Sequence, residues 1–572
     1  MTTLFRPRSS WRILVALLLI GLASCRDSVV KAPVATNVVQ GKQPLSAAEA
    51  PHEAFATKPV DPSDLFFDNG LVPEIRIELK KSQETKLRED LRRYVKCTIV
   101  ETLPNPDAPD SPHETTYTEV AIKVKGAAGS SRELDDKPAF TLNMNKHAKE
   151  QTFHGLGKLH LNNSVQDESY LCEWVCAEIA RDAKVPATRV THARVWLNGR
   201  DLGFYVLKEG FDRPFLTRHF GDASGNFYDG GFVQDVDADL EKDSGKGPDD
   251  HSDLHALQAA CEEPDAAVRW PAIEQQLDVD AFLTFMAFER MTCHWDGYTP
   301  NKNNYRIYFD PKDGRARFLP HGMDQMFQDP GFPILEFPPT IVSSAVMHNP
   351  EWRQRYKARI AELLPLFEAK RLHDRLNVVI ARLQPVVDSL GEDFAKAHAD
   401  QVREFKERIA AREPALREQL EHGDPTPIEF DETNQVEIAD WYGAQETGDT
   451  LLEEVDPETD RRYSIQVGES GDCVASWRRR VLLAQGRYRI EVTLKTEGVE
   501  PRTDEQGTGA GVRISGGKRD NKLVGDTDWQ TVSHDFEVTD DLRDVELVAE
   551  LRATKGRLWL KPTARLIRIE PE

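Results

Sequence analysis

The stretch HWDGYTPNKNNYRIY, residues 294–308, decides the fold expected for the centre of this chain. It follows an apolar run at Val279–Met291, which predicts a helix, while its own polar half predicts a loop. The alternation in Tyr305–Phe309 predicts a strand, which a turn and a second strand follow. A second polar stretch, PHGMD at residues 320–324, comes next. The expected order is therefore a helix, a polar loop, a hairpin and then the acidic residue Asp324.

Protein kinases present their catalytic groups in this same order. Asp296 stands at a helix end, with Asn301 five positions later and Asn304 eight positions later. The pattern His294-x-Asp296-x-x-x-x-Asn301 fits the kinase spacing H-R-D-x-x-x-x-N with Trp in place of Arg, and Asp324 follows the hairpin as the second kinase aspartate does. Taken singly, Asp296 and Asp324 could equally be residues that cap loops.

Six separated motifs extend this likeness to residues 119–327. In chain order they are VKGAAGSSR (124–132), KPAFTL (137–142), LHLNN (159–163), LNGRDLGFYVLKE (197–209), NYRIY (304–308) and PHGMD (320–324). Together they resemble the spore coat protein H (CotH) kinase family. The resemblance implies an α+β fold, namely an atypical protein-kinase-like bilobal domain, with ATP and Mg²⁺ (or Mn²⁺) as cofactors.

The resemblance also implies which residues bind the phosphates of ATP. Gly126 and Gly129 would let backbone N–H groups approach the phosphates, and Ser130 and Ser131 would add hydroxyl donors. The alternative for the two glycines is a plain turn. Lys137 would supply a positive charge to the phosphates, as the strand lysine of kinases does.

Three acidic residues receive supporting roles from the same resemblance. Glu173 and Glu178, on a helix expected from Asp167 to about Lys184, are candidates for the carboxylate that pairs with the lysine. Glu209 ends a hairpin strand where a kinase hinge would hold adenine. Lysines and glutamates are common on protein surfaces, so the alternative for each of these three glutamates is an ordinary solvent-exposed side chain without a role in a site.

The catalytic and metal roles fall on the polar stretches quoted first. Asp296 would accept the hydroxyl proton or orient the nucleophile. Asp324 would bind the metal, with Asn304 or Asn301 as the second ligand, because Mg²⁺ prefers hard oxygen donors. The family commonly has Asp-x-Asp where this chain has Gly322-Met323-Asp324, which puts two-metal catalysis in doubt. An enzyme requires that Lys137, Asp296 and Asp324 share one cleft.

The N-terminus predicts export and a lipid anchor. Residues 1–24 carry arginines and then an apolar run, as a secretory signal does, and Leu22-Ala23-Ser24-Cys25 resembles a bacterial lipobox. Cleavage before Cys25 and lipidation of its thiol would place the protein in the bacterial cell envelope, on the outer side of the cytoplasmic membrane or in the outer membrane. Residues 25–62 have no hydrophobic period and predict a flexible tether.

The rest of the chain divides into regions that differ in their sequence patterns. We expect the kinase-like domain at residues 63–345, a charged helical extension at residues 346–422, and an all-β sandwich at residues 428–572. The sandwich resembles galactose-binding or carbohydrate-binding modules, in which Trp529 and Trp559 could stack on sugars or simply fill the core. The six cysteines after Cys25 could form disulfides or remain buried thiols.

Charge and composition limit the function classes. The 572 residues contain 73 Lys and Arg against 96 Asp and Glu, a net charge of −23, which argues against a nucleic-acid partner. The favoured hypothesis is a lipid-anchored kinase that phosphorylates Ser or Thr of exported proteins. The alternative is a catalytically silent kinase-like lipoprotein that binds envelope polysaccharide or protein through its sandwich.

Overall fold

A computed structural model describes residues 61–422, 426–455, 462–469, 471–503 and 507–570, except residues 106 and 109. The expected signal peptide, Cys25 and nearly all of the expected tether lie outside the described residues. The chain divides into one unit at Met1–Pro59 and another at Val60–Glu572, and only the second is described below.

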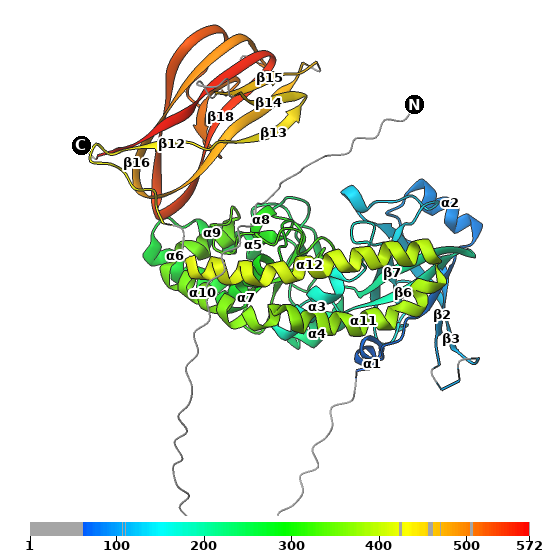
Figure 1. Cartoon of the computed structure of the whole chain (residues 1–572). Helices are drawn as coiled ribbons and strands as arrows, with labels where there is room; N and C mark the ends of the chain where they lie inside the picture. The colour runs from blue at the N-terminus through cyan, green and yellow to red at the C-terminus, as the bar shows by residue number, and fades with distance from the viewer. Residues whose placement is uncertain are drawn as a thin grey trace, which may run out of the picture. The chain divides into compact units, whose positions relative to one another are not determined.

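The first part of this unit is a closed barrel of seven strands (Figure 1). Around the barrel the order is β1-β2-β3-β4-β5-β7-β6, and β1 closes it by pairing with β6 in parallel. Burial alternates along strands such as β1 and β5, while β4 and the second half of β7 are buried continuously. Ile75, Val120 and Leu161 are among the fully buried side chains of the barrel. The strands are β1 (Glu74–Glu78), β2 (Val95–Leu103), β3 (His113–Lys125), β4 (Ala139–Asn143), β5 (Lys158–Asn162), β6 (Val190–Leu197) and β7 (Arg200–Glu209).

Four short helices accompany the barrel. They are α1 (Pro62–Asp68), α2 (Lys81–Glu89), α3 (Cys172–Asp182) and α4 (Arg213–Phe220), and a single 3₁₀ turn, η1, spans Ala128–Ser130. The helix expected from Asp167 begins later, at Cys172, because the Asp167 carboxylate holds the turn before it. The two carboxylate oxygens accept the backbone N–H of Ser169 (3.1 Å) and of Cys172 (2.9 Å).

The helical region that follows the barrel contains residues 294–308, the stretch HWDGYTPNKNNYRIY. Helix α7 (Val279–Met291) has the predicted bounds, and all but two of its thirteen side chains are buried. The loop after it contains the short helix α8 (Tyr298–Asn301) and leads into the antiparallel pair β10 (Tyr305–Phe309) and β11 (Ala316–Pro320). The remaining elements here are β8 (Phe227–Asp229), β9 (Lys242–Ser244), α5 (Ser252–Glu262) and α6 (Ala266–Gln276).

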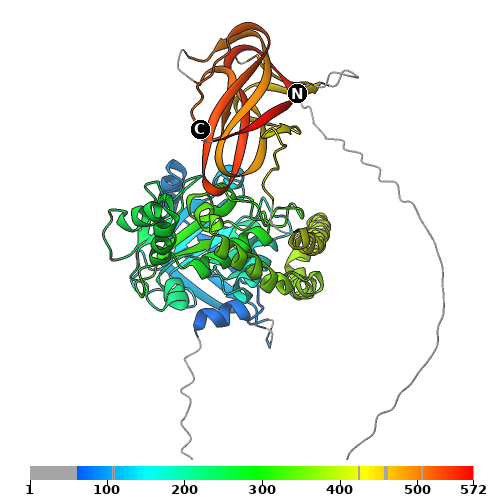
Figure 2. The same ribbon diagram turned by 90° about the vertical axis from the view of Figure 1, so that its left-hand side faces the viewer.

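The expected helical extension is present as a series of helices. They are α9 (Ile341–His348), α10 (Pro350–Leu363), the 3₁₀ turn η2 (Leu364–Phe367), α11 (Ala369–Ser389) and α12 (Glu392–His422). Helices α11 and α12 run side by side (Figures 1 and 2). Their apolar side chains join the same core as α3 and α7, so the extension packs as part of this helical region.

The C-terminal region is all β, as the sequence predicts. One barrel-like sheet has the order β13-β16-β18-β15-β14, and β12 and β17 each pair with β18. The long strands β16 and β18 bend and pair along most of their length, around a separate apolar core. The strands are β12 (Gln435–Ile438), β13 (Tyr442–Gly448), β14 (Thr450–Val455), β15 (Arg462–Val467), β16 (Cys473–Pro501), β17 (Gly509–Ile514) and β18 (Gly525–Ile569).

Two further observations bear on the sequence hypotheses. The six described cysteines are all buried and unbridged, which resolves the alternative in favour of free thiols: Cys97, Cys172, Cys176, Cys261, Cys293 and Cys473. Within the described ranges, no helix is both long enough and apolar enough to cross a membrane.

Candidate active site

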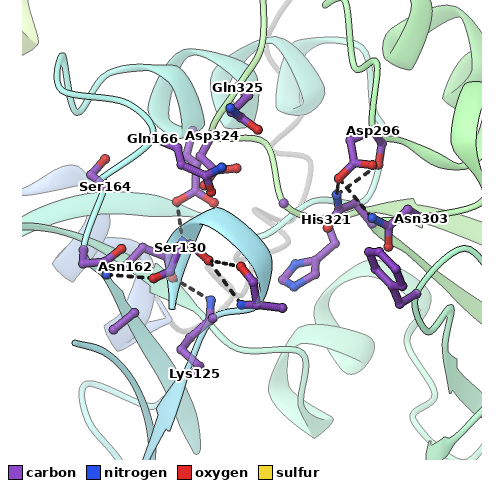
Figure 3. A pocket seen from close by; sticks show the side chains of 18 of the residues that line it. Lys125, Ser130, Asn162, Ser164, Gln166, Asp296, Asn303, His321, Asp324 and Gln325 are labelled. Carbon is purple, nitrogen blue, oxygen red and sulfur yellow. Dashed lines mark hydrogen bonds between the residues drawn. The ribbon is translucent and has the colours of Figure 1, made fainter. Parts of the chain in front are cut away.

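A cleft of about 400 Å³ lies where the barrel meets the helical part. One wall comes from the barrel strands β3, β4, β5 and β7 together with the start of α3. The other wall comes from the loop after α7 and from residues 321–325 after β11. Figure 3 shows Lys125 and Ser130 on one side of the cavity and Asp296 and Asn303 on the other, with His321 between them.

The glycine turn forms one edge of this cleft. Gly126 has φ +106°, a conformation that favours glycine, and it lines the cleft with Ser130. The Ser130 hydroxyl donates to the Ala127 carbonyl (2.9 Å), which closes the turn on itself. A Cβ at Gly129 would lie 2.7 Å from the Gln166 amide nitrogen, so this glycine permits a close approach. Gly129 and the exposed Ser131 are not among the residues that line the cleft.

Two lysines from different strands bring positive charge into the cleft. Lys208 on β7 donates to the Glu173 carboxylate (2.6 Å), and both side chains are at most 2% exposed. Asn162 donates to the other Glu173 oxygen (2.6 Å) and accepts from Lys125 at the end of β3 (2.6 Å). The result is one continuous chain of contacts, Lys125–Asn162–Glu173–Lys208, along the barrel wall of the cleft.

Burial and charge set the ionisation of this group. Burial and, to a smaller extent, the nearby Lys208 charge lower the pKa of Lys125 to about 8. Burial by itself would raise the pKa of Glu173, but Lys208 and Lys125 hold it below its ordinary value. Lys125 and Lys208 thus place two ammonium groups in the cleft beside the carboxylates of Glu173 and Asp324. Ammonium groups suit the negative oxygens of a nucleotide phosphate chain.

Lys137, which the sequence assigned to the phosphates, lies outside this cleft. Its ammonium donates to the Tyr170 hydroxyl (2.6 Å) and sits over the Tyr170 and Tyr205 rings, 4.8 Å and 5.2 Å from their centroids. These contacts hold it against the α3 side of the barrel. Lys137 therefore does not share a cleft with Asp296 and Asp324, and the condition set for an enzyme from the sequence is not met with this lysine. Lys125 and Lys208 do line the cleft with the two aspartates.

Glu209 and Glu178 also lie away from the cleft. Glu209 is fully buried and is paired with Arg189 (3.1 Å) and Arg218 (2.5 Å), so its carboxylate is fully engaged. Glu178 pairs with Arg181 (2.5 Å) and Arg375 (3.0 Å). Of the two candidates on α3, Glu173 is the one that meets a cleft lysine.

Asp296 is held by three asparagine side chains. Asn301 donates to its Oδ1 (2.7 Å), while Asn303 (3.0 Å) and Asn304 (2.7 Å) donate to its Oδ2. Asn304 also donates to the Asp296 backbone carbonyl (2.9 Å). The amides fix the carboxylate beside the cleft, which Asn303 and Asn304 line and Asn301 does not.

Asp324 occupies the other end of the cleft, close to Glu173 and the two lysines. Burial raises its pKa, the Glu173 carboxylate adds to the rise, and Lys208 and Lys125 oppose it. No side chain among the described residues donates a hydrogen bond to this carboxylate, so a hard cation could take the place of a donor. The donor chemistry fits Mg²⁺, which proteins bind through one or two carboxylates together with phosphate oxygens.

Gly322 replaces the carboxylate that the family commonly has two positions before Asp324. Its φ is +57°, and a Cβ there would lie 2.3 Å from the Asn304 side-chain oxygen. The described residues contain no group of three or more His, Cys, Asp and Glu side chains suited to a metal. The loop as folded thus offers Asp324 with amide oxygens and leaves no room for a second carboxylate at position 322.

Sequence reasoning missed Lys125, Lys208 and Asn162, although all three stand inside the quoted motifs. Lys125 directly precedes Gly126, Lys208 directly precedes Glu209, and Asn162 is the fourth residue of LHLNN and the last residue of β5. Strand alternation is the signal that could have found Lys208, because neighbours on a strand point to opposite faces.

The two tryptophans proposed for sugar stacking are both half-buried. Lys561 and Arg462 lie over the Trp529 ring, 4.8 Å and 5.6 Å from its centroid, and Arg557 lies over the Trp559 ring at 4.9 Å. Cations therefore cover part of each ring that a sugar would need.

A family profile and several known proteins are similar in sequence to part of this chain. The profile of the family described as CotH kinase protein matches residues 122–413, slightly more than half of the chain. Inner spore coat protein H of Bacillus subtilis is 22% identical over 267 residues, which cover 41% of this chain and 70% of that protein. Invasin CotH7 of Rhizopus delemar is 27% identical over 175 residues, 28% of this chain and 29% of the invasin, so the chain spans under a third of this fungal relative.

Similar solved structures are more distant. The Helicobacter pylori proinflammatory kinase CtkA is 13% identical, covers 47% of this chain and 93% of its own, and has a TM-score of 0.24. BiXyn10A CBM1 is 14% identical over 24% of this chain and 99% of its own, with a TM-score of 0.17. At TM-scores this low, neither likeness establishes a shared fold.

Proposed function

The chain belongs to the CotH kinase protein family and is kinase-like, and from this premise we propose that it transfers the γ-phosphoryl group of ATP to a Ser or Thr hydroxyl of an exported protein. Such a family suggests ATP and a divalent metal in general. One observation carries the proposal: a single cleft places Lys125, Lys208 and Asp324 opposite Asp296.

The barrel wall of the cleft would bind the nucleotide phosphates. Lys125 and Lys208 supply positive charge, and Glu173 fixes the position of Lys208. The turn at Gly126 and Ser130 lets backbone N–H groups approach the phosphates closely. Lys125 and Lys208 thereby take the role that the sequence assigned to Lys137.

The opposite wall would act on the acceptor hydroxyl. The hydroxyl oxygen bonds to the γ-phosphorus, the bond from that phosphorus to the β–γ bridging oxygen breaks, and ADP leaves. The hydroxyl proton passes to the Asp296 carboxylate, which Asn301, Asn303 and Asn304 hold in place. General-base assistance of this kind contributes about 10²–10⁴-fold to a rate.

Asp324, with the side-chain amide oxygen of Asn304, would hold Mg²⁺ or Mn²⁺, whereas Asn301 does not line the cleft and is not used. When bound, such an ion neutralises negative charge on the phosphates and so makes it easier for ADP to leave the γ-phosphorus. Asp324 needs to be ionised for this role, and the two neighbouring lysines favour the ionised form. The proposal requires one such ion, because Gly322 supplies no second carboxylate.

The location is part of the same proposal. A signal at residues 1–24 and a lipid on Cys25 would hold the protein at the bacterial envelope, where exported proteins are the available acceptors. The acceptor would be a protein segment rich in Ser or Thr.

The test is phosphoryl transfer from labelled ATP, with Mg²⁺ or Mn²⁺, to a Ser- and Thr-rich peptide and to the same peptide with alanines at those positions. We expect label on the first peptide and none on the second. If the chain transfers no label and ATP does not raise its melting temperature, the silent binding protein becomes the better hypothesis.

A further inference from the structure

A second cavity, of about 590 Å³, lies beside α3 and is larger than the nucleotide cleft. Its walls come from α1, α3, the segment 184–190, the end of α4, and α11. Helix α3 contributes Trp174, Ala177, Glu178 and Arg181, which share one helix face at positions i, i+3, i+4 and i+7. The positions of α1, α3 and α11 can be followed in Figure 1.

One part of this cavity is apolar. The side chains of Val185 (4% exposed) and Phe67 (8% exposed) line the cavity together with Trp174 and Pro186, and the Arg189 guanidinium lies over the Phe67 ring, 4.7 Å from its centroid. Apolar walls of this kind favour a ligand with an aromatic or aliphatic body, since burying such a body removes apolar surface from water.

The other part is cationic. Five basic side chains line the cavity against three carboxylates. The basic residues are Arg181, Lys184, Arg189, Arg218 and Arg382, and the acidic ones are Asp64, Asp68 and Glu178. The carboxylates already have partners, because Asp64 pairs with Arg189, Glu178 with Arg181, and Asp68 with Arg181 at 3.8 Å.

Two of the cations lack such a partner. Among the described residues, no carboxylate lies within 4.0 Å of the charged groups of Lys184 or Arg382, although both side chains line the cavity. The Arg382 Nε is buried without a hydrogen-bond partner, and its Nη2 meets only the His192 ring at 3.5 Å. Burial also lowers the pKa of Arg382, so an anion beside it would restore the favourable environment of its charge.

We propose that this cavity binds an amphipathic organic anion, with an apolar body against Trp174 and Val185 and one carboxylate or phosphate group beside Lys184 and Arg382. Such a ligand would tie α11 to the end of α3. Helix α3 also carries Glu173, the partner of Lys208, so the ligand would stabilise the helix that positions the cleft lysine. The binding event itself does not depend on phosphoryl transfer.

The test is calorimetric titration of the full chain with naphthalene-2-carboxylate, and with the neutral naphthalene-2-carboxamide as its isostere. For a probe of this size we expect a Kd on the order of 1 mM or tighter. The carboxamide should bind at least tenfold more weakly, since it lacks the anionic group.

Variants locate the site. Arg382→Gln and Lys184→Gln should each weaken carboxylate binding about tenfold, and Lys184 is exposed, so its replacement leaves the core intact. Lys370→Gln is the matched control, because Lys370 lies on the same α11 and pairs with Asp374 outside the cavity. The proposal is overturned if the carboxylate does not bind, or if it binds Lys184→Gln and Lys370→Gln equally well.

Discussion

Lys208 donates a 2.6 Å hydrogen bond to Glu173, and this buried pair joins strand β7 to helix α3 at the barrel wall of the cleft. The two residues are far apart in sequence, and each favours the charged form of the other in this buried setting. The pair therefore links the fold of the barrel to the charge that the cleft offers a nucleotide.

Removing one member of this pair should harm both stability and nucleotide binding. Lys208→Met leaves Glu173 with Lys125 as its remaining cation, and breaking a buried pair typically costs about 3–5 kcal/mol. We expect a lower melting temperature and no further rise with ATP. Lys561→Met, a lysine of the C-terminal region, controls for the loss of a lysine. A Lys208→Met variant that still gains stability from ATP as the native chain does would contradict the role of this pair.

The two cleft lysines should matter more to ATP than Lys137 does. Lys125 lines the cleft, whereas Lys137 is directed to Tyr170 outside it. Lys125→Met should therefore raise the Kd for ATP at least tenfold, and Lys137→Met should change it by less than about twofold. Fluorescence titration with an ATP analogue measures both values. The opposite ranking would restore the assignment made from the sequence motif.

Introducing the missing family carboxylate should damage this site. Gly322→Asp places a side chain at φ +57° and within 2.3 Å of the Asn304 oxygen. Backbone strain of this kind costs about 1–3 kcal/mol, and Asn304 would be displaced from Asp296. Gly314→Asp is a matched control, because Gly314 has φ +76° and nothing within 4 Å of its added Cβ. We expect Gly322→Asp to melt at a lower temperature than Gly314→Asp, and equal melting temperatures would show that position 322 has room.

Acid should destabilise the fold through buried histidines. Burial lowers the pKa of His192 to about 3, while an unfolded histidine has a pKa near 6.5. The unfolded chain therefore binds more protons, so stability falls as the pH drops below about 6.5, and His192 contributes about 2 kcal/mol of this loss by pH 5. His192→Gln should lose less stability than the native chain between pH 7 and pH 5, whereas the exposed His113→Gln should match the native chain. Thermal melting across this range measures the difference.

The local sequence pattern was sufficient to predict most of the helices and strands around the site. Strand β5 and helix α7 have the predicted bounds, because alternation in the strand and continuous apolar residues in the helix reflect their burial directly. The polar loop after α7 also places Asp296 and Asn304 together, since both belong to one short connection. These features depend on residues close in sequence.

The basic wall of the cleft could not be predicted in this way. Lys125 and Lys208 come from β3 and β7, which meet through Asn162 and Glu173 only once the barrel has closed. Lys208 lies in the cleft, whereas the next residue on β7, Glu209, points to the other side of the strand and pairs with Arg189 and Arg218. Alternation along a strand explains why these two neighbours point to opposite sides. Which of the two sides faces the cleft depends on how the barrel closes.

The measurement that tests the kinase proposal most directly is transfer from labelled ATP by the native chain, by Asp324→Ala and by Asp329→Ala. Asp324 lines the cleft, whereas Asp329 is an exposed carboxylate five residues later that caps the Gly331 backbone N–H (2.8 Å). We expect the native chain and Asp329→Ala to transfer label at similar rates, and Asp324→Ala to lose at least 10²-fold. Equal transfer by all three proteins would contradict the assignment of this cleft as the catalytic site.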